Sequence, residues 1–217
     1  MSSPMCRTLQ TASLVFQTAL TSTLKSQRII ALPDAQETSS DPCDIGTDPD
    51  ILQHIVEEEK WPVDLYLVKD GWNQKKTRSR YSQSNDAIRA RARDVRLFLR
   101  GLLRELVSNG DADAEIALVT HGGFLHYLTD DWEDSYRYPG TGWYNCETRA
   151  YVFECDFWSN RDEEAWLIET RESRWRRGKD HPMYGKKDQV KLFTAAMERW
   201  EEQGLERPDE VDLDSEI

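Results

Sequence analysis

The sequence has no long hydrophobic run and no segment that resembles a targeting signal. No stretch approaches the roughly 18 apolar residues that a membrane-spanning helix needs. Residues 1–25 carry Thr and Gln throughout, in place of the compact apolar region of a signal peptide. We therefore predict a soluble, cytoplasmic protein with no membrane partner.

Cysteine and histidine are scarce, with four of each in 217 residues. The cysteines have neither the CxxC spacing nor the Cys/His pairing of a zinc site, and reduced thiols are the expected state. They are Cys6, Cys43, Cys146 and Cys155. The sequence thus predicts no metal site and no other cofactor.

Basic residues are outnumbered, with 28 Lys and Arg against 40 Asp and Glu, for a formal net charge of -12. Such a chain repels nucleic acid unless its positive charge is locally concentrated. The arginine-rich segment at residues 89–100 is predicted to be a solvated helix face, and we expect no nucleic-acid partner. Its members are Arg89, Arg91, Arg93, Arg96 and Arg100.

The length suits one domain with a substantial core. We assign residues 1–204 to this domain and predict that residues 205–217, which are rich in acidic side chains, form a disordered tail. No internal repeat is present, and the oligomeric state is left open.

The first half of the chain alternates helix and strand signals. Residues 5–24 have helical spacing, "RIIALP" predicts a short strand, residues 34–50 a loop and "PDILQHIVEEE" a helix. The clearest helix lies within "SNDAIRARARDVRLFLRGLLRELVSNG", where one apolar stripe recurs at steps of three and four. The stripe consists of Ile88, Ala92, Val95, Leu99, Leu102 and Leu106.

The segment "EIALVTH" is almost continuously apolar, as expected for a strand of a parallel sheet that is covered on both faces. A helix precedes it and another follows it, which indicates a layered α/β fold. Farther on, "TRAYVFEC" and "AWLIET" predict two strands, and "DQVKLFTAAMERWEEQ" predicts a closing helix. One side of that helix carries Val190, Phe193, Met197 and Trp200.

His121 is predicted at the carboxyl end of the buried strand, which is where open α/β sheets bind ligands. Gly122 and Gly123 permit close approach of the backbone, and the next helix offers N–H groups to an anion. This arrangement suits phosphate; the alternative is a purely structural histidine. The remaining histidines are assigned that structural role, and they are His54, His126 and His181.

Two motifs resemble those of the histidine phosphatase superfamily, in its phosphoglycerate mutase-like branch. "LVTHGGFLH" resembles the second-histidine motif, and "SSPMCRTLQTA" resembles the Ser-Pro-x-x-Arg-x-x-x-Thr-Ala segment. Between and after them, "IIALPDAQETSSDPCDIGTD" and "YNCETRAYVFE" resemble the family's glutamate-bearing and Asn-Cys segments. The similarity covers residues 2–155, and the sequence resembles fungal members of the family in particular.

The resemblance implies a three-layer αβα sandwich and a pocket for a small phosphorylated substrate or inorganic phosphate. Matched position by position, Arg7 is a phosphate-binding arginine, His121 the second catalytic histidine, and Glu37 the acid that protonates the leaving oxygen. Gly122 is expected to contribute to the phosphate-binding turn. These residue types suit that chemistry, because arginine matches phosphate oxygens and a carboxylic acid can protonate an alkoxide. A phosphatase is expected ahead of a mutase.

The sequence departs from the family in one respect: it contains no Arg-His-Gly, the motif that ends the family's first strand and carries the phosphorylated histidine. Three explanations compete: an incomplete gene prediction, which we favour, a shortened form lacking the amino end, and a relative that has abandoned phosphoryl transfer. Cys6, where relatives often carry a second arginine, is consistent with the third. Two classes therefore stay open, a phosphohistidine phosphatase and a non-catalytic or repurposed protein that keeps an anion pocket.

Overall fold

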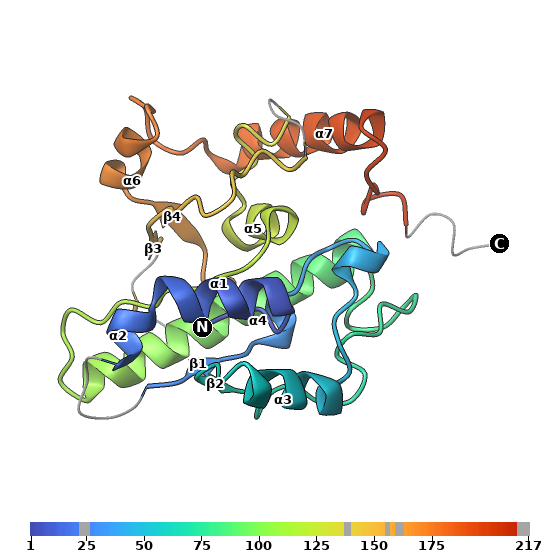
Figure 1. Cartoon of the computed structure of the whole chain (residues 1–217). Helices are drawn as coiled ribbons and strands as arrows, with labels where there is room; N and C mark the ends of the chain where they lie inside the picture. Colours follow the sequence, from blue (N-terminus) through green and yellow to red (C-terminus); the bar gives the residue numbers. More distant parts are fainter. Residues whose placement is uncertain (22–26, 137–139, 155–156, 159–162, 212–217) are drawn as a thin grey trace.

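The chain folds into seven helices and four short strands within the part that the computed structural model describes, which is residues 1–21, 27–136, 140–154, 157–158 and 163–211 (Figure 1). The helices are α1 (Cys6–Val15), α2 (Gln17–Thr21), α3 (Pro49–Glu58), α4 (Asn85–Ser108), α5 (Gly122–Thr129), α6 (Arg171–Arg176) and α7 (Lys186–Glu202). The strands are β1 (Ile29–Ile30), β2 (Val63–Asp64), β3 (Tyr151–Phe153) and β4 (Leu167–Glu169), and the two 3-10 turns are η1 (Pro33–Ala35) and η2 (Pro42–Asp44). The predicted α/β character is confirmed.

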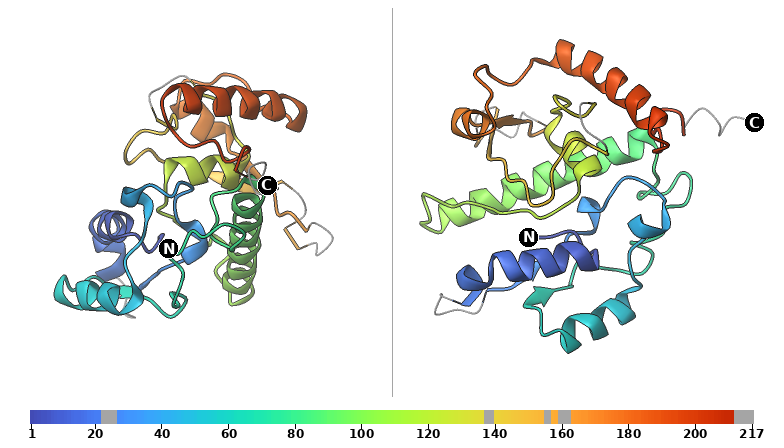
Figure 2. Two further views of the ribbon diagram at one scale, coloured as in Figure 1. Left: turned by 90° about the vertical axis from the view of Figure 1, so that its right-hand side faces the viewer. Right: turned by 45° about the horizontal axis from the view of Figure 1, so that its top comes forward.

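Helix α4 is the longest element, and it runs between α7 on one side and α1 with α3 on the other (Figures 1 and 2). The Ser84 side chain caps its first turn by accepting a hydrogen bond of 3.3 Å from the Ala87 N–H. Ile88, Ala92 and Val95 of the predicted apolar stripe are fully buried. The stripe therefore packs on the core as expected.

A short parallel sheet is assembled around Ser2, which lies between Ala31 and Val119. The Ser2 N–H donates to the Ile30 carbonyl, and the Ser3 N–H donates to the Val119 carbonyl. Strand β2 extends the sheet on the far side of β1. The sheet thus places the first residues of the chain beside the segment that leads to α5.

Side chains of this sheet alternate between two apolar clusters, as the strand period of two requires. Ile29, Ala31 and Val119 pack with α1 and α3, whereas Ile116 and Leu118 pack with α4 and α5. Helices therefore cover both faces of the sheet where Ser2 pairs with its neighbours.

The segment before His121 is only half covered, which corrects the prediction of a strand buried on both faces. The Ala117 side chain is exposed, and Leu118 is only partly buried. Within the described residues, the backbone groups of Ile116, Leu118 and Thr120 that point away from Ser2 pair with no other strand. An edge with unpaired N–H and C=O groups can accept another strand.

Strands β3 and β4 form a separate antiparallel pair in which Val152 lies opposite Ile168. Both strands were predicted, although Cys155 lies outside the described residues. Of the cysteines that the structure describes, Cys6, Cys43 and Cys146 form no disulfide. The predicted closing helix is also present as α7. Its residue Val190 is 66% exposed, however, and does not share the buried face of Met197 and Trp200.

The predicted solvated arginine face of α4 is wrong for three of its five members. Arg91, Arg96 and Arg100 are buried, whereas Arg89 is exposed and Arg93 is intermediate. The Arg91 guanidinium donates to the backbone carbonyls of η1 and the residue after it, and Arg96 donates to carbonyls of α5. These cations were expected to be hydrated at the surface, but inside the protein backbone carbonyl groups accept their hydrogen bonds instead.

A buried ionic cluster joins β4, α6 and the loop after α5. It consists of Glu133, Glu169, Arg174, Arg177 and Lys179. The Glu169 carboxylate has a fully buried side chain and accepts two bonds from Arg177, at 2.7 and 3.0 Å, and one from Arg174, at 3.3 Å. The Arg174 guanidinium also contacts Glu133 at 2.8 Å. The cluster thus ties three elements together through charge.

Residues 205–211 of the predicted acidic tail belong to the part of the chain that the structure describes. Residues 205–211 return to the start of α4, where the Asn85 N–H donates to the carbonyl of the buried Pro208. Residues 212–217 lie outside the described residues. In the part of the chain that is described, no helix is both long and apolar enough to cross a bilayer.

Candidate active site

Arg7 and His121 meet in the structure, although 114 residues separate them in the sequence. Arg7 lies in the first turn of α1, and His121 is the residue that precedes α5. The Arg7 Nη2 atom lies 3.0 Å from the His121 Nδ1 atom. The predicted proximity of these two residues is therefore confirmed.

The Arg7 contact fixes which nitrogen of His121 carries the proton. A guanidinium can only donate, so Nδ1 accepts and a neutral ring holds its proton on Nε2. Nε2 lies 2.9 Å from the Ser3 Oγ atom and donates to it. This tautomer cannot take a proton from Ser3, which argues against a serine hydrolase built on the same pair.

The His121 ring is buried and held neutral. Burial, reinforced by the nearby cations Arg7, Lys75 and Arg91, holds the pKa of His121 well below its usual value. A neutral ring donates one hydrogen bond and does not compete with Arg7 for the charge of a bound anion. His121 can donate to a phosphoryl group only when its Nε2–H leaves the Ser3 hydroxyl.

Glu37 closes the amino end of α5. Its carboxylate accepts from the N–H groups of Gly123 and Phe124, at 3.3 and 3.0 Å, and from its neighbour Thr38 at 2.9 Å. A helix N-terminus stabilises negative charge, and here the protein supplies that charge itself. Among the described residues, the backbone N–H groups of His121 and Gly122 have no hydrogen-bond acceptor.

Burial raises the pKa of the Glu37 carboxyl group, and the hydrogen bonds from Thr38 and Phe124 oppose this effect. A raised pKa keeps a carboxyl group protonated closer to neutral pH, which a proton donor needs. Once the proton has left, the three backbone N–H groups receive the carboxylate. The environment of Glu37 therefore suits both protonation states of an acid catalyst.

Each glycine of the His-Gly-Gly turn has its own packing reason. A Cβ atom on Gly122 would lie 2.1 Å from the Thr141 Oγ1 atom, whereas one on Gly123 would lie 2.6 Å from the Glu37 Oε1 atom. Both distances are far below van der Waals contact. The absence of a side chain at Gly123 thus lets the Glu37 carboxylate contact the start of α5, and its absence at Gly122 lets Thr141 and Trp143 pack against the same turn.

We expect Gly123→Ala to lower the free energy of unfolding by about 1–3 kcal/mol, because the added methyl displaces Glu37 and leaves buried N–H groups unpaired. Gly101→Ala is the matched control. Gly101 lies in α4, and no atom lies within 4 Å of the position that an added Cβ would take, so this change should stabilise by about 1 kcal/mol through helix propensity. Urea unfolding of both variants measures the difference, and equal effects would show that Glu37 does not depend on Gly123.

Two cations of the site were not predicted from the sequence. Lys75 donates to the backbone carbonyls of Glu37 and Ser39, and burial, followed by Arg91, lowers its pKa to about 8. Arg91 is completely buried, and its Nε and Nη2 atoms have no acceptor within the described part of the chain. The burial of Arg91 could have been inferred from the sequence, because Arg91 lies three residues from Ile88 and four from Val95 of the apolar stripe. No pattern in the sequence around Lys75 indicates its burial.

Asp44 opposes the cations and occupies Arg7. The Arg7 Nη2 atom lies 2.7 Å from Asp44 Oδ1, and Nη1 donates to the Cys43 carbonyl at 2.5 Å. The Arg7 side chain is 45% exposed, so it can leave Asp44 for an incoming anion. The site as it stands is closed by its own side chains and opens through Arg7.

The described residues contain no group of three His, Cys, Asp or Glu side chains placed to hold a metal ion. Comparison with protein-family models, with curated proteins and with solved structures found no match for this chain. The function must therefore be inferred from the geometry of the site and from the sequence resemblance.

Proposed function

We propose that this chain carries the phosphate-binding half of a histidine phosphatase-type active site and acts on a small phosphomonoester. The observation that carries the proposal is the contact between Arg7 and His121, which unites the two residues that the motifs select. The Gly122 N–H, which has no acceptor among the described residues, is a further donor at the start of α5 beside His121. In this proposal Arg7 binds the phosphate oxygens, and the Nε2–H of His121 turns from the Ser3 hydroxyl to donate to the transferring group.

Glu37 is the proton donor in this proposal. Its carboxylate bonds to the N–H groups of Gly123 and Phe124, which follow His121 at the start of α5, and burial raises its pKa. Protonation of the leaving oxygen turns an alkoxide into an alcohol, which departs more readily. Lys75 donates to the backbone carbonyl of Glu37 and in this proposal adds positive charge near the phosphate.

The nucleophile of this reaction is a residue other than the histidines of the site. The proton on Nε2 and the Arg7 contact at Nδ1 leave His121 without a free lone pair for attack. We propose that the attacking histidine belongs to an additional strand that pairs with the open edge at Ile116, Leu118 and Thr120. That strand would complete a three-layer αβα sandwich, since helices already cover both faces of the sheet beside it.

A second candidate is a non-catalytic or repurposed protein that retains the anion pocket. The observation that favours it is the closed state of the site, in which Asp44 holds Arg7 and Glu37 holds α5. These internal carboxylates take the contacts that a substrate phosphate needs. Binding without turnover is the outcome expected for this class.

Arg7→Ala tests the pocket that both candidates share. Phosphate, sulfate or vanadate at about 100 times its dissociation constant should stabilise the parent protein by about 2.7 kcal/mol, a shift of roughly 5–10 °C for this size. The variants are made in an Arg89→Ala background, because Arg89 lies in a separate cleft that could also bind an anion. We expect Arg7→Ala to remove most of this protection, measured against the melting temperature of the same variant without anion. Arg176→Ala, an exposed arginine of α6, is the control and should keep it. Equal protection of both variants would place the anion elsewhere.

A further inference from the structure

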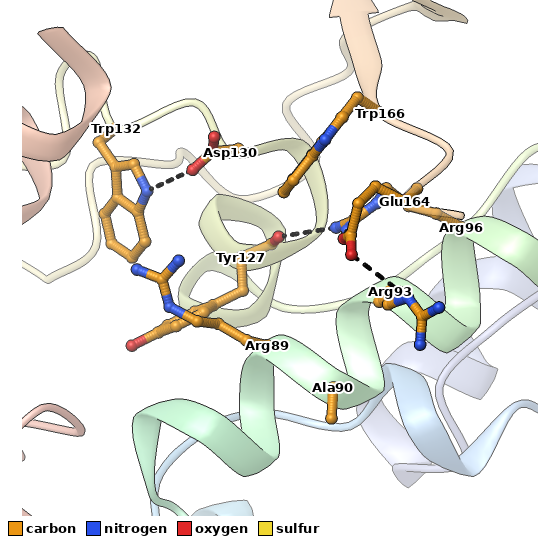
Figure 3. A pocket seen from close by; sticks show the side chains of 9 residues that line it. All are labelled: Arg89, Ala90, Arg93, Arg96, Tyr127, Asp130, Trp132, Glu164 and Trp166. Atoms are coloured by element: carbon orange, nitrogen blue, oxygen red, sulfur yellow. Dashed lines mark hydrogen bonds and ion pairs between the residues drawn. The ribbon is translucent and has the colours of Figure 1, made fainter. Parts of the chain in front are cut away.

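A cleft lies on the opposite side of α4 from Arg91 and the candidate active site. It has a volume of about 430 Å³ and is enclosed by α4, by the end of α5 with the loop that follows, and by the segment before β4 (Figure 3). Side chains of α4 form one wall, and Trp132 and Trp166 stand across from them. The cleft is large enough for a small organic molecule.

Three arginines of α4 line this cleft, at Arg89, Arg93 and Arg96. Their spacing by four and three residues places them on one side of the helix, where like charges repel one another. Within a chain of net charge -12 this is a local concentration of positive charge. An anion bound between the guanidinium groups relieves their repulsion.

The three arginines differ in how much of their charge is compensated. Glu164 lies 3.4 Å from Arg93 and 3.2 Å from Arg96. Arg93 also lies 4.0 Å from the Glu163 carboxylate and donates through Nε to the Glu163 carbonyl, so a phosphate must compete with these acceptors for it. Arg89 is exposed, donates through Nε to the Asn85 side-chain amide, and has no carboxylate partner among the described residues. The uncompensated charge of the cleft therefore lies at the Arg89 guanidinium, whose two terminal nitrogens are available to a ligand.

The opposite wall is held in place and carries an acceptor. The Trp166 ring packs against the Arg96 guanidinium at 4.2 Å and the Lys186 ammonium at 3.2 Å. Lys186 also contacts Asp130 at 3.0 Å, and Asp130 accepts from the Trp132 indole at 3.3 Å. The Asp130 carboxylate retains further lone pairs that can accept from ligand hydroxyl groups.

We propose that this cleft binds a small phosphorylated molecule that carries hydroxyl groups, such as a sugar phosphate. Its phosphate lies between Arg89 and Arg93, and its hydroxyl groups donate to Asp130. Arginine pairs favour phosphate through bidentate hydrogen bonds, and the acidic wall selects hydroxyl groups over a second anion. The cleft shares no lining residue with the Arg7 site, so this proposal does not depend on the function proposed for that site.

Titration calorimetry with ribose 5-phosphate tests the cleft, with the whole series carried out in an Arg7→Ala background to remove the other pocket. We expect Arg89→Ala to weaken binding about tenfold or more, because one charge-assisted contact is lost. Arg89 is exposed and caps no element, so the variant should fold. Arg176→Ala is the matched control and should bind as the background does.

Asp130→Asn separates hydroxyl recognition from simple anion binding. It should reduce the preference for ribose 5-phosphate over inorganic phosphate while leaving the affinity for inorganic phosphate unchanged or slightly higher. Absence of binding at millimolar ribose 5-phosphate, or equal binding by Arg89→Ala and the background, overturns the site. If Arg7→Ala instead keeps full anion protection, that result contradicts the function proposed for the Arg7 site and does not affect the proposal for the cleft.

Discussion

The 217-residue chain is expected to hydrolyse an aryl phosphate at least about 10⁴-fold more slowly than a longer chain that also contains an Arg-His-Gly strand. The comparison applies if the gene encodes such a strand upstream. Arg7, His121 and Glu37 can hold and polarise the phosphoryl group, but the His121 ring has no free lone pair with which to attack it. Nucleophile and acid act as a unit, and loss of one member removes most of the rate enhancement. Release of the aryl alcohol from both proteins measures the difference.

His121→Ala in each protein is the companion variant. In the longer chain it should abolish turnover, and in the shorter chain it should change nothing above background. If the shorter chain turns over substrate and loses that activity on His121→Ala, then His121 or a water that it orients is the attacking group. That result would contradict the proposal that a separate histidine is required.

Glu169→Gln is expected to lower the free energy of unfolding by about 3 kcal/mol. The change keeps the shape of the side chain but removes the charge that Arg174 and Arg177 contact, and both cations are largely shielded from water. Removing one partner of an isolated buried ion pair typically costs about 3–5 kcal/mol, and the expected loss lies at the lower end because Arg174 keeps Glu133, and Arg177 keeps Asp131 and Asp134, as partners. Denaturant unfolding followed by circular dichroism measures the loss.

Glu172→Gln is the control for this change. Glu172 lies in the first turn of α6, three residues along the chain from Glu169, and is exposed. Its substitution should alter stability by less than about 0.5 kcal/mol, as surface changes generally do. A loss below about 1 kcal/mol for Glu169→Gln would show that the buried ionic cluster contributes little to stability.

The helices were predictable because each carries its own periodic pattern. The stripe of α4 continues through Ile88, Ala92 and Val95, and Ser84 provides its cap, so both the element and its start follow from local chemistry. The burial of Arg91 was not predictable in the same way. Its acceptors are the carbonyl groups of Asp34 and Gln36, which come close only after the chain has folded.

The candidate site was predictable where a short motif brings its own geometry. The turn at His121, Gly122 and Gly123 follows from an extended segment, bridged to Ser2 at Val119, that leads into α5, and the proximity of Arg7 followed from the resemblance. The role of Glu37 as the cap of α5 needed the structure, because 86 residues separate it from Gly123. Lys75 was missed for a similar reason, since nothing in its surrounding loop sequence indicates burial.

The position of Ser2 between Ala31 and Val119 governs the order in which the molecule can assemble. Pairing with Ala31 closes a loop of about thirty residues, whereas the Met1 nitrogen reaches Ala117 across 116 residues. Closing a loop about four times longer costs roughly 1 kcal/mol more in chain entropy, and contacts between such distant residues slow folding. During synthesis the contacts of Met1 and Ser2 with Ala117 and Val119 can form only after the segment before α5 has left the ribosome. Only then can Arg7 and His121 meet.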